Sequence, residues 1–184
     1  MNTLIRKLFL IVTLSVLILL ALPMQSAYAA GPNDPPKPGA TPDPERANTR
    51  LEWTFARLKI SVERIGLNLE YSDEFLARVD ELLVKAKENG KDVSAIETAL
   101  TAYKTALDES KPIYEQAEKI VQTHAGFDAN GKVTDPEKAK ATVKELGETL
   151  KQHREVMSDA AKALREAVKA FRAANPRPTK TPKP

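Results

Sequence analysis

The sequence predicts an all-α protein: an antiparallel up-down-up bundle of three long helices with coiled-coil-like packing and disordered proline-rich ends. Apolar residues recur at alternating steps of four and three in three stretches, as on the buried stripe of a packed helix. Short to moderate segments rich in glycine, asparagine and aspartate separate these stretches. The alternation typical of a half-buried strand is absent from the sequence.

Residues 1–29 have the pattern of a signal peptide. Arg6 and Lys7 precede an apolar run, and Ala27-Tyr28-Ala29 forms a small-residue cleavage site. We therefore expect a secreted protein, extracellular or periplasmic. The alternative is an uncleaved anchor, because the apolar run is nearly long enough to span a bilayer. No other membrane contact is expected.

Proline-rich segments flank the predicted bundle of residues 45–175. Residues 30–44 form a spacer rich in proline and glycine, and residues 176–184 form a basic tail of similar composition. Such segments favour polyproline II conformation and lack apolar periodicity, so both are expected to be disordered.

The first helix is expected at about residues 45–89. Asp43-Pro44-Glu45 is a typical helix start, and Asn89-Gly90 is a typical end. The apolar stripe passes through Ser72 without a phase shift, which favours one continuous helix. A break at Tyr71-Ser72-Asp73, giving four shorter helices, is the alternative.

The second and third helices are expected at about residues 94–124 and 135–174. The loop between them contains Phe127 and Val133, which we expect to anchor it on the bundle. Asn130-Gly131 between these anchors is typical of a tight turn.

Composition excludes several classes of function. Without cysteine the chain has no disulfide, no lipobox lipid and no c-type haem linkage. Residues 46–174 contain 22 basic and 22 acidic residues, so there is no strong field to attract nucleic acid.

No catalytic, cofactor or metal site is predicted, and we expect no enzyme. A di-iron bundle needs Glu-x-x-His, but Val121 and Leu150 stand three residues before His124 and His153. The loop beginning at Asp128 lacks the oxygen ligand, glycine and glutamate of an EF-hand. Nucleophile-elbow and phosphate-loop motifs are also absent from the sequence.

One surface departs from an ordinary solvated helix. Trp53, Ile60 and Leu67, called the outer row below, lie on the face opposite the apolar stripe, with Arg57 and Arg64 beside them. Aromatic residues and arginine are enriched at binding hot spots. The row predicts an interaction surface used for self-association, or for a heterologous partner or hydrophobic client. Alternatively, the row is covered within the same chain, by the proline-rich leader folding back or by a helix arrangement different from the one predicted.

Four polar residues are expected at one level of the bundle. If the helices fold back at the predicted turns, Ser72, Ser110 and His153 come to similar heights, with Tyr103 within reach. We expect hydroxyl–imidazole hydrogen bonds there, which would set the helix register.

Together these patterns predict a secreted or cell-envelope helical-bundle protein that acts by protein–protein interaction or self-association, without catalysis or cofactors. The expected partner is another protein or a second copy of the chain, which would make a homo-oligomer. The alternatives are a periplasmic chaperone-like binder of unfolded chains or membrane surfaces, and a small-molecule carrier with a pocket in the bundle.

Overall fold

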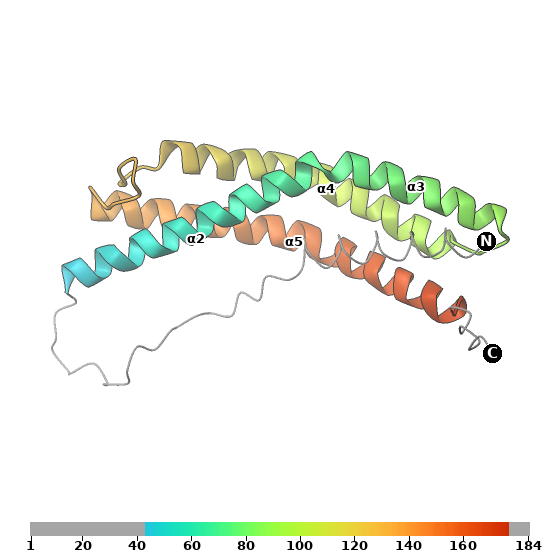
Figure 1. Ribbon diagram of the computed structural model, residues 1–184. Coiled ribbons are helices and arrows are strands. Elements are labelled where there is room, and N and C mark those ends of the chain that lie inside the picture. Colours follow the sequence, from blue (N-terminus) through green and yellow to red (C-terminus); the bar gives the residue numbers. More distant parts are fainter. Residues whose placement is uncertain (1–42, 177–184) are drawn as a thin grey trace, which may run out of the picture. The chain divides into compact units, whose positions relative to one another are not determined.

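The computed structural model describes residues 43–176, and this part of the chain is all-helical (Figure 1). Its four helices are α2 (Pro44–Glu70), α3 (Ser72–Glu88), α4 (Ser94–Thr123) and α5 (Pro136–Ala174). Between residues 43 and 176 there is no strand, only one isolated bridge, between Phe127 and Val133. The predicted signal peptide, residues 30–42 of the spacer and residues 177–184 of the tail lie outside the described residues.

The prediction of one continuous helix over residues 45–89 is wrong, because Tyr71 separates α2 from α3. The Ser72 hydroxyl donates a 2.7 Å hydrogen bond to the Leu69 carbonyl. A serine side chain that bonds to its own backbone in this way competes with the helical ladder. The ladder of α3 restarts at Tyr71, whose carbonyl accepts from the Phe75 amide at 3.1 Å. Ser72 remains buried, so the apolar stripe keeps its phase across the break.

The described residues form two compact units. One unit comprises residues 69–110 and 154–176, which include α3, the first part of α4 and the last part of α5. The other comprises residues 43–68 and 111–153, which include most of α2, the rest of α4, the α4–α5 loop and the first part of α5.

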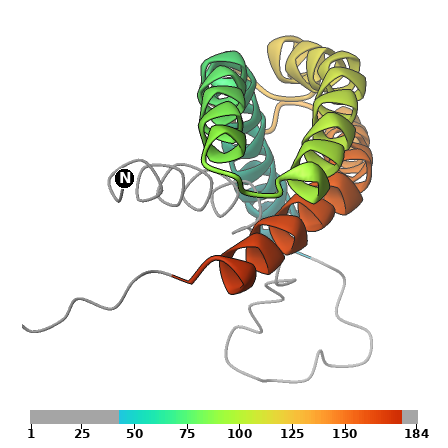
Figure 2. The same ribbon diagram turned by 90° about the vertical axis from the view of Figure 1, so that its right-hand side faces the viewer.

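In the first unit, α3 and α4 are joined by a short connection that Figure 2 shows end-on. Ion pairs join these helices at 2.7 Å, from Lys104 to Asp80 and from Lys87 to Glu97. Asp92 accepts hydrogen bonds from the backbone amide and hydroxyl of Ser94, so α4 begins where the sequence predicts. These bonds lower the pKa of the Asp92 carboxyl group.

The second unit has a core to which three helices and the loop contribute. Its buried members are Phe55, Leu58, Val62, Ala117, Phe127, Ala139, Leu146 and Leu150. The rings of Phe55 and Phe127 are stacked, with centroids 4.3 Å apart. The core therefore fixes which face of α2 is buried and which face is exposed.

The α4–α5 loop is held by its own backbone. The Gly126 carbonyl accepts hydrogen bonds from the amides of Thr134 and Asp135, at 2.9 and 3.2 Å. Gly126 has φ +85°, and a β-carbon there would collide with the amide nitrogen of Ala139. Phe127 is buried and bridges Val133, so the predicted anchoring of the loop is confirmed.

Candidate functional site

The outer row lies on the exposed face of α2. Trp53 is 70% exposed, Ile60 47% and Leu67 54%. Successive members are seven residues apart, so the row is roughly 21 Å long at about 1.5 Å per residue. The three side chains lie in line, roughly 10.5 Å apart along the helix axis, while the opposite face of the same helix is fixed in the core.

Charged side chains border the row on both sides. Arg57 and Arg64 are exposed along one edge, and Glu63 is exposed along the other. None of the three forms an ion pair with another residue between 43 and 176. Their charges are therefore available to a partner. The sequence prediction included the arginines and missed Glu63, although its position on the helix wheel would have identified it.

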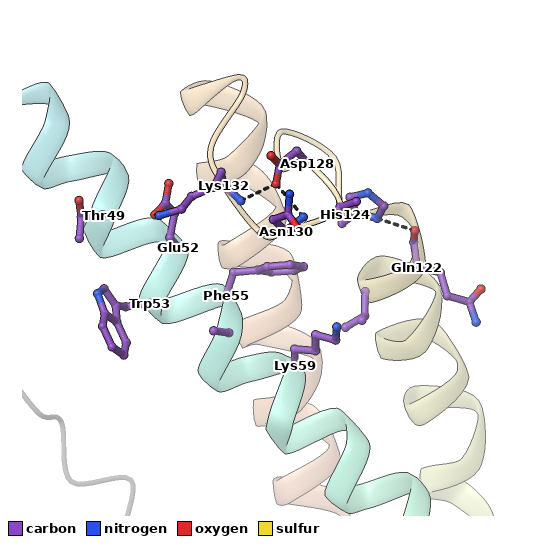
Figure 3. Close-up of a pocket in the computed structure, with 14 residues that line it drawn as sticks. Thr49, Glu52, Trp53, Phe55, Lys59, Gln122, His124, Asp128, Asn130 and Lys132 are labelled. Atoms are coloured by element: carbon purple, nitrogen blue, oxygen red, sulfur yellow. Dashed lines mark hydrogen bonds and ion pairs between the residues drawn. The ribbon is translucent and has the colours of Figure 1, made fainter.

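A cavity of about 710 Å³ adjoins the N-terminal end of the row, between α2 and the α4–α5 loop. We call it the loop cavity. Figure 3 shows Phe55 pointing from α2 toward the loop, with Trp53 on the other side of the helix. Trp53 also lines the cavity, so the two features meet at this residue.

An ion pair between two lining residues of the loop cavity joins α2 to the loop. Glu52 accepts a 2.8 Å hydrogen bond from the Lys132 ammonium group and a 3.1 Å bond from the Val133 amide. The bond from Lys132, followed by the one from Val133, lowers the pKa of the Glu52 carboxyl group. The same contact raises the pKa of Lys132. Glu52 thus holds the loop against α2, and its carboxylate is engaged by Lys132 and Val133.

The remaining polar groups of the cavity are largely used by the loop itself. One Asp128 carboxylate oxygen accepts from the amides of Asn130 and Lys132, both at 2.8 Å. A ring nitrogen of His124 lies 2.8 Å from the Gln122 carbonyl oxygen. Apolar atoms of Phe55, Ala56 and Val121 also line the cavity. This lining suits a small amphipathic molecule.

No metal-binding group was found in the part of the chain that the structure describes: nowhere do three histidine, cysteine, aspartate or glutamate side chains gather closely enough. None of the helices between residues 43 and 176 combines the length and the apolar character that crossing a membrane requires.

The four residues of the predicted polar level are all buried. Ser72, Ser110 and Tyr103 belong to the first unit, and His153 belongs to the second. The Ser110 hydroxyl donates to the Leu107 carbonyl at 2.8 Å, as Ser72 does to Leu69. The Ser72 hydroxyl thus donates across the break to α2, and the Ser110 hydroxyl donates within α4. A hydrogen bond from the His153 imidazole to one of these hydroxyl oxygens stays a prediction.

Burial shifts the ionisation of the two titratable members of this level. It raises the pKa of Tyr103 to about 12 and lowers the pKa of His153. Both side chains are therefore uncharged at neutral pH, which suits a role in packing.

Comparison of the chain with protein-family models, with curated proteins and with solved structures found no match.

Proposed function

We propose that the protein is a non-catalytic binding protein, secreted or held in the cell envelope, that acts by protein–protein contact through the outer row. The observation that carries this proposal is the exposure of Trp53, Ile60 and Leu67 in line on one helix. Single exposed apolar side chains are common, whereas a contiguous patch with polar edges is typical of an interaction site.

The rigidity of α2 supports the proposal. Phe55, Leu58 and Val62 hold the helix in the core of its unit, so the row is presented without a large ordering cost. Arg57 and Arg64 add side chains of the type enriched at binding hot spots. Secretion is proposed from the signal-like pattern of residues 1–29.

We also propose the finer architecture: an antiparallel three-helix bundle in which α2 and α3 together take the place of the first helix. The continuous apolar phase through the buried Ser72 supports this arrangement. The short connection between α3 and α4 also supports it, because such connections join antiparallel neighbours.

The test compares a variant of the row with a matched control. Leu67→Glu places a charge on the row, and Val84→Glu places the same charge on α3 at a residue of equal exposure, 54% against 55%. The triple variant Trp53→Glu, Ile60→Glu and Leu67→Glu removes the row completely. Circular dichroism should show native helicity in all of them, because the altered side chains are exposed.

Light scattering over a range of concentrations then measures the mass. We expect an associated wild type, a lower mass for the row variants, and no change for Val84→Glu. A wild type that is monomeric throughout, and that does not suppress aggregation of an unfolded test protein through the row, contradicts the proposal. Suppression by a monomer supports the chaperone-like alternative.

The loop cavity favours a second candidate function, carriage of a small amphipathic molecule. Its volume of about 710 Å³ lies within the range of roughly 300–1,000 Å³ typical of ligand pockets. Native mass spectrometry of the purified protein should then show a bound mass. Val121→Phe, which narrows the cavity from α4, should remove that mass while leaving the row on α2 intact.

A further inference from the structure

The two edges of the outer row carry opposite charges. At about 100° per residue, Arg57 and Arg64 lie about 60° and 40° to one side of Ile60, and Glu63 lies about 60° to the other. All three side chains are exposed and without ion pairs among residues 43–176. A second copy of the chain can place its own row on this one in two symmetric ways, which bring different edges together.

An antiparallel two-fold pairing centred on Ile60 brings the same edge of both helices together. Arg57 of one copy then lies within roughly 1.5 Å, along the helix axis, of Arg64 of the other. Glu63 faces Ala56, which has no charge, and Lys59 on the same side of the helix lies farther from the row and lines the loop cavity. Arginine thus opposes arginine on one side, an arrangement that like-charge repulsion disfavours.

A parallel two-fold pairing brings opposite edges together. Glu63 of each copy then lies roughly 1.5 Å along the axis from Arg64 of the other. Arg57 faces the small side chain of Ala56, and no two arginines oppose each other. In the row itself, each apolar side chain meets its own counterpart.

We propose that the outer row binds a second copy of this chain with the two α2 helices parallel, so that Trp53, Ile60 and Leu67 each pack on the same residue of the other copy. The proposal rests on the proposed function and names its partner. Such an interface is isologous and closes at a dimer. Three apolar side chains per copy make a small contact, so the dimer forms in a concentration-dependent way.

The test uses single cysteines in the full chain, which has none of its own. In the parallel dimer, residue 53 lies opposite residue 53, within the Cα separation of about 7 Å or less that a disulfide needs. In the antiparallel dimer the same two residues are roughly 21 Å apart along the axis. Trp53→Cys alone and Leu67→Cys alone should therefore each form disulfide-linked dimers under mild oxidation.

The control is Val84→Cys, whose side chain is equally exposed on α3 and reports random collision. We expect the two row variants to cross-link at least tenfold faster than this control. Ile60→Cys cross-links in either orientation, so it tests self-association through the row independently of direction. Cross-linking of Ile60→Cys, together with a disulfide formed only in a mixture of Trp53→Cys and Leu67→Cys, overturns the parallel pairing and leaves the proposed function standing.

Charge reversal tests the edges. Glu63→Arg should raise the dimer dissociation constant at least fivefold, because positions 63 and 64 of the two copies then carry like charges. Adding Arg64→Glu should restore the constant to within twofold, because the charges at these two positions are again opposite. A double variant that stays as weak as the single variant overturns the proposal.

Two further outcomes identify another occupant and overturn the proposal. One is a monomer whose Trp53 emission shifts to the blue only with phosphatidylglycerol vesicles. The other is a monomer whose emission shifts to the red when residues 30–42 are deleted. In both cases Ile60→Cys should cross-link no faster than Val84→Cys.

Discussion

Gly126→Ala should destabilise the protein far more than the same change at Gly131. Both glycines have positive φ, +85° and +77°, so a β-carbon at either costs on the order of 1–2 kcal/mol in backbone conformation. At Gly131 the new methyl group has open space, and the loss should end there. At Gly126 the methyl group would collide with the Ala139 amide nitrogen and lie 2.7 Å from the Asp135 carbonyl oxygen.

These neighbours of Gly126 are backbone atoms, so the loop must move. The movement strains the bonds from Thr134 and Asp135 to the Gly126 carbonyl, each contributing about 1 kcal/mol. We therefore expect Gly126→Ala to lower the free energy of unfolding by about 3–4 kcal/mol, from the backbone cost and the two bonds together. Urea unfolding followed by circular dichroism at constant protein concentration measures both variants. Equal losses at the two positions would refute the crowding argument.

Three further predictions concern the second unit. Phe127→Ala should cost about 3–5 kcal/mol in urea unfolding, because it removes a buried ring stacked on Phe55; a loss below 1 kcal/mol would contradict that packing. Glu52→Gln should speed hydrogen exchange of the Val133 amide, measured by NMR, because its acceptor loses charge; unchanged exchange would show that Glu52 does not hold the loop. Burial lowers the pKa of His153 in the folded state. The buried neutral imidazole therefore makes its full contribution to the free energy of unfolding above the unfolded pKa of about 6.5, and this contribution is lost as the pH falls through the folded pKa. His153→Gln should accordingly make the free energy of unfolding fall less steeply between pH 7 and 5. An unchanged slope would show that protonation of His153 does not cause the fall.

Local signals in the sequence locate most helix ends closely. The proline starts of α2 and α5, and the Asp92 cap of α4, depend on a few neighbouring residues, and the structure has them within one residue of prediction. The exposure of the outer row follows from helix periodicity alone. The Glu52 contacts could not be predicted in the same way, because Lys132 and Val133 lie 80 and 81 residues away in the chain. Only the packed loop brings them to α2.

The break at Tyr71 illustrates what apolar periodicity leaves out, and it makes a last prediction. The apolar stripe keeps its phase because Ser72 stays buried. The helix is nevertheless interrupted at Tyr71, where the Ser72 hydroxyl donates a 2.7 Å hydrogen bond to the Leu69 carbonyl. If that hydroxyl competes with the helical ladder, Ser72→Ala removes the competitor, and alanine is the better helix former by about 0.5 kcal/mol. Urea unfolding should then show a stability equal to the wild type or higher by up to about 0.5 kcal/mol, with no loss of ellipticity at 222 nm. A loss of about 1 kcal/mol would mean instead that the hydroxyl satisfies a carbonyl that the ladder cannot reach, and that the break is set by Tyr71.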